Sequence, residues 1–114
     1  MKKIGQIYRS GIWMVKQGMA EEFITAWLSS ANWLVENIPG ERDGEALLLQ
    51  DLGNPHKFIS FAWSGMSEKT DELLASAEFQ GIMADIRELC EDIQPHRMQV
   101  VGYSAPKDVH IEDL

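Results

Sequence analysis

Cysteine is scarce in this chain of 114 residues: Cys90 is the only one, so no intrachain disulfide can form. Basic residues are also few, because ten lysines and arginines stand against 18 aspartates and glutamates, for a net charge of −8. A nucleic-acid backbone or an anionic membrane surface would repel such a chain. We therefore expect neither nucleic acid nor a membrane as a partner.

Long apolar runs are missing as well. The longest are only a few residues, which predicts no membrane span. No apolar stretch follows Lys2 and Lys3, which argues against a secretory signal. With a single cysteine, these absences predict a cytoplasmic protein.

The composition that is present fits one globular domain. Apolar residues make up 45% and charged residues 25% of the chain, both near the average of folded domains. A chain of this length has room for one hydrophobic core. We expect a domain over residues 1–104 and a polar C-terminal tail over residues 105–114.

Hydrophobic periodicity predicts the element order β-α-β-β-α-β. Strands are expected at about 7–16, 46–51, 57–64 and 97–104, and helices at about 19–38, 67–74 and 76–92. The segment Leu52–His56 is typical of a hairpin turn, and Pro95 is expected to end the last helix. This order predicts an α+β, ferredoxin-like fold: an antiparallel sheet with its helices on one face.

The predicted central strands are apolar on both faces. Leu47, Leu48 and Leu49 point to alternate faces, and so do the apolar residues of 58–63. A sheet with one solvated face would alternate apolar and polar residues. A second copy of the chain, packed sheet against sheet, is the simplest cover for the face without helices. We predict a homodimer; the alternative is a monomer with an exposed apolar face.

Five segments carry a family resemblance through their order along the chain. They are Val15–Phe23, Ile38–Gly40, Asn54–Phe58, Trp63 and Leu74–Phe79. Over about residues 7–104 the chain thereby resembles the antibiotic biosynthesis monooxygenase family of dimeric α+β barrels. The resemblance implies this fold and the dimer. Some members are cofactor-free oxygenases of polycyclic phenols or quinols, and others degrade haem.

The same resemblance implies a pocket between the sheet and the helices. Trp63 stands where a family tryptophan lines that pocket, and an indole offers a flat apolar wall with one N–H donor; the alternative is an ordinary core tryptophan. The residues that we predict to line the pocket are Trp63, Tyr8, Ser10, Trp27, Asn32, Ser60, Phe79 and Met83. The catalytic residue is left unassigned.

Other family positions differ in this chain. The haem-degrading branch uses a histidine in the last helix and an asparagine in the first strand, and neither Phe79–Ile86 nor Arg9–Gly11 supplies one. Leu73 replaces a histidine found in many relatives, and Ile59 replaces an asparagine of the phenol-oxidising members. The missing helix histidine argues against haem ligation, and we predict that the protein uses no cofactor. The replacements at Leu73 and Ile59 count against transferring any one activity of the family to this chain.

The histidines, the cysteine and one further tryptophan are not predicted to form a functional site. His56, His96 and His110 each lack a second ligand at metal-binding spacing, so no metal site is predicted. Cys90 falls on the apolar stripe of the predicted last helix, which indicates a buried, unreactive thiol. Trp33 lies off the stripe of the first helix, so it is either exposed or covered by a partner or the tail.

Two functions stay open. One is a cofactor-independent monooxygenase that oxidises a small aromatic or quinol-type compound in the pocket. The other is a non-catalytic dimeric module of the same fold that binds a small apolar molecule. A polar cavity of ligand size beside Trp63 favours the enzyme, whereas a space filled by Phe23, Trp27, Phe79 and Met83 disfavours it.

Overall fold

The computed structural model describes residues 4–37, 46–63 and 68–104, and at Trp63 and residues 68–70 it describes the backbone alone. The described elements are β1 (Ile7–Val15), α1 (Ala20–Asn37), β2 (Ala46–Asp51), β3 (Asn54–Trp63), α2 (Glu68–Leu74), α3 (Ala77–Glu88) and β4 (Cys90–Gln99). This order confirms the predicted α+β, ferredoxin-like fold. The predicted C-terminal tail, residues 105–114, lies outside the described residues.

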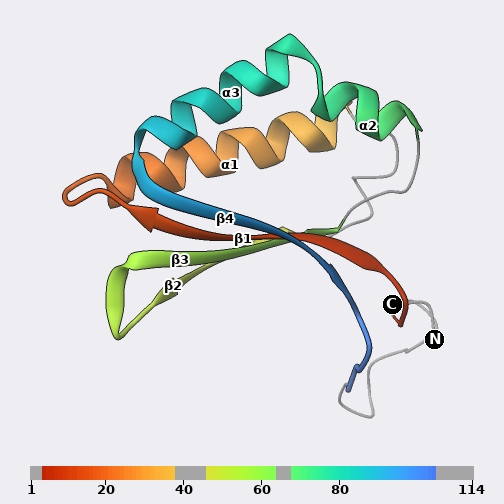
Figure 1. Ribbon diagram of the computed structural model, residues 1–114, viewed down its shortest axis with the longest axis horizontal. Coiled ribbons are helices and arrows are strands. Elements are labelled where there is room, and N and C mark those ends of the chain that lie inside the picture. Colours follow the sequence, from red (N-terminus) through yellow and green to blue (C-terminus); the bar gives the residue numbers. More distant parts are fainter. Residues whose placement is uncertain (1–3, 38–45, 64–67, 105–114) are drawn as a thin grey trace.

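The four strands form one antiparallel sheet in the order β2-β3-β1-β4. The helices lie together on one side of this sheet (Figure 1). The sheet therefore has one face that the helices cover and one face that no described element covers. Among the described residues, no helix has both the length and the apolar character to cross a bilayer.

The core lies between the sheet and the helices because strand alternation places Trp13 and Val15 of β1 on the helix side. Phe23, on the apolar stripe of α1, is fully buried and packs against residues of two strands. Its ring centroid lies 5.5 Å from that of Trp13 and 5.0 Å from that of Phe58. Ile86 of α3 belongs to the same buried cluster. The core therefore joins both α1 and α3 to the two central strands.

The last helix and strand differ from their predicted bounds. Helix α3 ends at Glu88 and β4 begins at Cys90, although the periodicity predicted a helix to residue 92 and a strand from residue 97. Strand β4 pairs with β1 along its whole length, from Cys90 opposite Val15 onward. Pro95 therefore lies inside an edge strand, where a missing N–H is tolerated, and does not end the helix.

The hairpin between β2 and β3 is tighter than predicted. Strand β3 already begins at Asn54, which pairs with Asp51, so only Leu52 and Gly53 form the turn. The backbone N–H of Gly53 donates a hydrogen bond to Asp51 Oδ1 at 2.7 Å. This hydrogen bond to the Asp51 side chain stabilises the two-residue turn.

Trp33 is covered by a neighbouring helix. Its Nε1 donates a hydrogen bond to Glu78 Oε1 of α3 at 3.0 Å, and its ring centroid lies 5.4 Å from that of Phe79. The sequence predicted that Trp33 is either exposed or covered by a partner or the tail. In the structure, α3 covers it instead. The contact joins α1 to the start of α3.

The sheet face without helices is apolar over β2, β3 and part of β1, whereas Asp92, Gln94 and His96 of β4 make the other edge of this face polar. In register, Ile12 lies opposite Ile59, and Ile59 lies opposite Leu49. Leu47 and Leu49 of the edge strand are 50% and 49% exposed, and Met98 on the other edge is 48% exposed. We call Ile12, Leu47, Leu49, Ile59 and Met98 together the outer apolar face.

Candidate ligand-binding cavity

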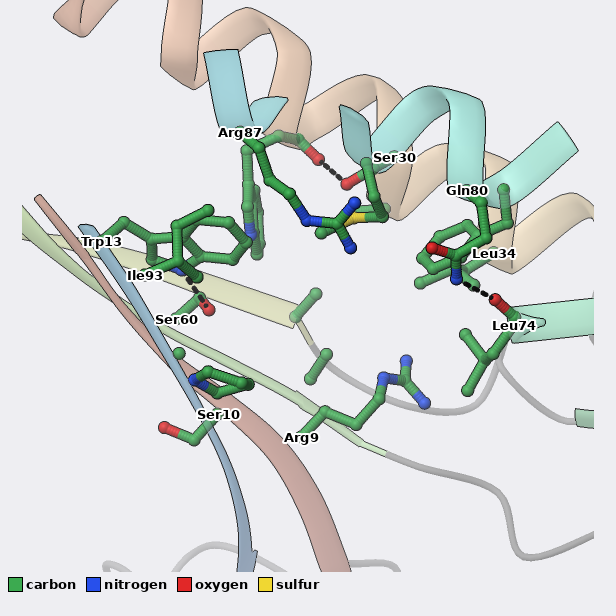
Figure 2. A pocket seen from close by; sticks show the side chains of 18 of the residues that line it. Arg9, Ser10, Trp13, Ser30, Leu34, Ser60, Leu74, Gln80, Arg87 and Ile93 are labelled. Carbon is green, nitrogen blue, oxygen red and sulfur yellow. Dashed lines mark hydrogen bonds between the residues drawn. The ribbon is translucent and has the colours of Figure 1, made fainter. Parts of the chain in front are cut away.

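A cavity of about 640 Å³ lies between the helix-covered face of the sheet and helices α1 and α3. Figure 2 shows side chains entering this space from the strands on one side and from the helices on the other. Small-molecule sites have volumes of about 300–1,000 Å³. The cavity is therefore large enough for a ligand with several fused rings.

Small side chains on neighbouring strands create the hollow floor. Gly11 of β1 pairs with Ser60 of β3, and Ala62 of β3 pairs with Ala46 of β2. All four residues line the cavity. A Cβ atom added to Gly11 would lie 2.8 Å from Trp13 Nε1, which is closer than real Cβ contacts allow. Because Gly11 has no side chain, the Trp13 indole can occupy the space beside it.

A buried hydrogen bond fixes one polar group on this floor. Trp13 Nε1 donates to Ser60 Oγ at 2.9 Å, and both residues are buried. In this bond the Ser60 oxygen is the acceptor, so its own O–H can donate to a ligand. No buried side-chain nitrogen or oxygen of the described residues lacks a hydrogen-bond partner.

Two helices supply an aromatic and aliphatic roof. Trp27 and Leu34 come from α1, and Phe79 and Met83 come from α3. The start of α3 is held by Ser76, whose Oγ accepts a hydrogen bond from the Phe79 N–H at 3.2 Å. Such a cap sets where the helix begins, and hence where its cavity-facing side chains lie.

Two arginines give the cavity its charge. Arg9 comes from β1 and Arg87 from the last turn of α3. Figure 2 shows both guanidinium groups directed into the space between the sheet and the helices. The described lining contains no aspartate, glutamate, histidine or lysine. A protein of net charge −8 therefore has a cavity whose charged side chains are cationic.

The predicted site residues are only partly brought together. Ser10, Trp27, Ser60, Phe79 and Met83 line the cavity. Tyr8 and Asn32 do not line it, and Asn32 is exposed on α1. Trp63 pairs with Tyr8 through the backbone, and its side chain lies outside the described residues. Whether this set binds a substrate stays a prediction.

Sequence reasoning did not single out Trp13, Gly11, Arg9 or Arg87 as site residues. The two arginines stand far apart in the chain, and no motif links them. One signal was available, because Arg9 is a charged residue in an otherwise uncharged strand, IYRSGIWMV. Only the sheet register and the placement of α3 show that both residues line one cavity.

Cys90 is buried, as predicted, although it begins β4 and does not lie on a helix. Desolvation by burial raises the pKa of its thiol from 9.0 to about 11, against a smaller lowering by the positive charge of Lys16. A thiol with such a pKa stays protonated at neutral pH and is a poor nucleophile. Cys90 does not line the cavity.

The histidines give no metal site among the described residues. His56 lies in β3 and His96 in β4, both exposed, while His110 lies outside the described residues. Within the described part of the chain, no three histidine, cysteine, aspartate or glutamate side chains form a cluster that could hold a metal ion. The polar and aromatic groups of the described cavity lining are arginines, serine hydroxyls, one glutamine amide and aromatic rings.

Solved structures with this fold include an oxygenase. SnoaB, a cofactor-independent oxygenase from Streptomyces nogalater solved as a single-residue variant, has a TM-score of 0.73 and 15% identity, covering 87% of this chain and 96% of that one. A candidate antibiotic biosynthesis monooxygenase from Caulobacter crescentus has a TM-score of 0.70 and 15% identity, over 88% and 93% of the two chains. A third, from Bordetella bronchiseptica, has a TM-score of 0.68 and 17% identity, over 85% and 98%.

No family model matches the sequence, and no curated protein matches it. The likeness therefore lies in the fold. The chain has the fold of the antibiotic biosynthesis monooxygenases, which confirms the structural part of the resemblance that the ordered segments carry. Fold alone does not assign chemistry, so any activity depends on the residues that line the cavity.

Proposed function

We propose that the protein is a cofactor-independent monooxygenase that oxidises a polycyclic phenol or quinol in the cavity between the sheet and the helices. The observation that carries this proposal is a ligand-sized cavity with aromatic walls, a hydroxyl donor and two cationic side chains. The named activity of SnoaB on the same fold supports it. The rings of Trp13, Trp27 and Phe79 offer flat apolar surfaces on which a fused aromatic substrate can pack.

The reaction needs an electron-rich substrate anion. A phenolate gives one electron to O₂, which yields a phenoxyl radical and superoxide, and the two join through a new C–O bond at a ring carbon. Protonation gives a hydroperoxide, and O–O cleavage with loss of the ring-carbon hydrogen releases water. One oxygen atom stays on the ring as a quinone carbonyl and the other leaves as water, so phenol and O₂ become quinone and water.

The cavity favours the anion through charge. Its described lining has no group that titrates near neutral pH, so removal of the substrate proton depends on making the phenolate more stable. A guanidinium stays cationic at all relevant pH values and lowers the pKa of a phenol beside it. We assign this role to Arg87, with the Ser60 hydroxyl as a further donor to the phenolate oxygen.

The alternative function is a binding module of the same fold. It is favoured by the absence of a carboxylate or imidazole base from the described lining. Such a module would hold the same aromatic ligands without consuming oxygen. The two functions therefore share a ligand class and differ in turnover.

We further propose that two copies associate through the outer apolar face. Leu47, Leu49 and Met98 are half-exposed there, next to Ile12 and Ile59 on the central strands. Exposed apolar surface of this extent favours association, and two identical faces can cover each other about a twofold axis. The cavity lies on the opposite face of the sheet, so dimerisation leaves it accessible.

Oxygen uptake tests the enzymatic proposal. Purified protein is given naphthalene and anthracene phenols and hydroquinones, and uptake is followed with an oxygen electrode together with quinone absorbance. We expect uptake and quinone in equal amounts, above the rate without protein. Ligand binding without any uptake would contradict the enzyme and support the binding module.

Matched variants place the reaction in the cavity. Met83→Trp fills the space beneath α3 and should abolish most uptake, because Met83 lines the cavity. Ala84→Trp adds the same ring at the next residue, which is exposed and does not line the cavity, and should keep the wild-type rate. Trp63→Phe tests the tryptophan that the family resemblance singles out. Equal rates in the first two variants would contradict the proposed location.

A further inference from the structure

Met83 is the one methionine, among the described residues, that lines the cavity. Met14 lies in β1, Met19 packs against the core beside α1, and Met98 lies on the sheet edge with 48% of its surface exposed. Cys90 also lies outside the lining. Peroxides oxidise a thioether to a sulfoxide. The described lining therefore contains a single oxidisable sulfur.

Met83 is half-buried because it packs against both hydrophobic clusters of the described residues. One cluster includes Trp13 and Trp27, and the other consists of Leu34 and Phe79. An oxidant in bulk solvent has limited access to a side chain in this position. A molecule inside the cavity can contact the thioether directly, since Met83 belongs to the lining. The location of the oxidant therefore controls how fast this sulfur reacts.

Arg87 lies four residues after Met83 on α3, and both residues line the cavity. Residues four apart lie on the same side of a helix. When a sulfur takes the terminal oxygen of a hydroperoxide, negative charge develops on the inner oxygen. A guanidinium nearby stabilises that charge. The thioether and the cation together therefore favour the transfer of one oxygen atom to Met83.

We propose that Met83 is a modification site, which an organic hydroperoxide oxidises when it occupies the cavity. The sulfur attacks the terminal oxygen, the O–O bond breaks and an S–O bond forms. The hydroperoxide proton moves to the inner oxygen, so a hydroperoxide and a methionine become an alcohol and a methionine sulfoxide. The sulfur loses the electron pair that the hydroperoxide gains. This inference rests on the proposed function only for the source of the hydroperoxide, which forms there from the substrate and O₂.

The sulfoxide changes what the cavity can bind. Oxidation converts a flexible apolar side chain into a polar one, in a roof whose other members, Trp27, Leu34 and Phe79, are aromatic or aliphatic. An aromatic ring then loses an apolar contact at this position, so the oxidised protein binds aromatic ligands more weakly. Oxidation of Met83 therefore limits the number of turnovers that one protein molecule completes.

Two peroxides test this inference without turnover. The full chain is treated with cumene hydroperoxide, which is aromatic and apolar, or with hydrogen peroxide, and mass spectrometry of tryptic peptides measures the oxygen gained at each methionine. Hydrogen peroxide should oxidise the exposed Met98 ahead of Met83. With cumene hydroperoxide, the ratio of Met83 to Met98 oxidation should rise at least about tenfold, because a bound reactant has a higher effective concentration. Excess naphthol should protect Met83 but not Met98.

Matched variants assign the effect to the cavity. Ala31→Phe adds a ring within the lining, on α1, and should return the ratio to its hydrogen peroxide value. Ala84→Phe adds the same ring at an exposed residue of α3 outside the lining and should keep the wild-type ratio. Treatment with cumene hydroperoxide should weaken naphthol binding by the wild-type protein. Met83→Leu, which has no sulfur there, should bind naphthol equally before and after treatment.

Each outcome either supports or overturns the inference. Equal Met83-to-Met98 ratios with the two peroxides overturn it, and so does equal protection of both residues by naphthol. Oxygen uptake from phenols without a raised ratio overturns this inference and leaves the proposed oxygenase standing. A raised ratio in a protein that takes up no oxygen with any phenol supports this inference and overturns the oxygenase.

Discussion

Trp13 Nε1 donates a hydrogen bond to Ser60 Oγ at 2.9 Å, and this buried contact joins the two central strands at the floor of the cavity. Both residues are less than a tenth exposed. The bond fixes the plane of the indole and the position of the hydroxyl, so the same contact serves stability and ligand binding. Removing this hydrogen bond should therefore lower the free energy of unfolding.

Ser60→Ala removes the acceptor and leaves the indole N–H of Trp13 buried without a partner. We expect a loss of about 1–3 kcal/mol in the free energy of unfolding, measured by urea denaturation. Ser29→Ala changes an exposed serine of α1 and should have little effect. Equal stabilities of the two variants would show that the Trp13–Ser60 bond contributes nothing.

Two glycine substitutions should have effects of opposite sign. A Cβ on Gly11 would meet Trp13 Nε1 at 2.8 Å and Ser60 Oγ at 3.2 Å, so the indole must move. We expect Gly11→Ala to cost about 1–3 kcal/mol of stability and to weaken ligand binding. A Cβ on Gly81, within α3, meets nothing within 4 Å, so Gly81→Ala should add about 0.5–1 kcal/mol. Thermal denaturation of both variants checks the signs.

The outer apolar face should control the oligomeric state. Sedimentation equilibrium at micromolar concentration should give twice the chain mass of 12.9 kDa. Leu49→Glu places a charge on the outer apolar face, at a side chain 49% exposed in one protomer, and should give the monomer mass. Leu52→Glu makes the same change in the hairpin turn, at a residue 95% exposed, and should stay dimeric. A wild-type mass of one chain would contradict the dimer.

The Cys90 thiol should be protected and should couple stability to alkaline pH. Burial raises its pKa to about 11, so the folded protein should react with iodoacetamide far more slowly than the urea-unfolded protein at pH 8. The unfolded thiol loses its proton at lower pH than the folded one. The free energy of unfolding should therefore fall as pH rises from about 9 towards 11. The fall should be smaller in Cys90→Ala, which has no thiol, and the difference between the two proteins is the contribution of Cys90.

Local hydrophobic periodicity predicted the bounds of those elements whose own residues carry the pattern. Helix α1 spans Ala20–Asn37 against a predicted 19–38, because its buried stripe repeats at helical spacing. Strand β2 has the predicted bounds, Ala46–Asp51. Strand β4 was mispredicted because pairing with β1 extends it to Cys90, and no local pattern records that pairing.

The sequence by itself determined the fold class, the two-sided apolar sheet and several residues of the cavity, such as Trp27 and Met83. These follow from the alternation and spacing of neighbours in the chain. Only the tertiary structure decided that Arg9 and Arg87 line one cavity and that Trp13 bonds to Ser60. Contacts between residues so distant in the chain depend on strand register and helix placement, which are set by the packing of the whole domain.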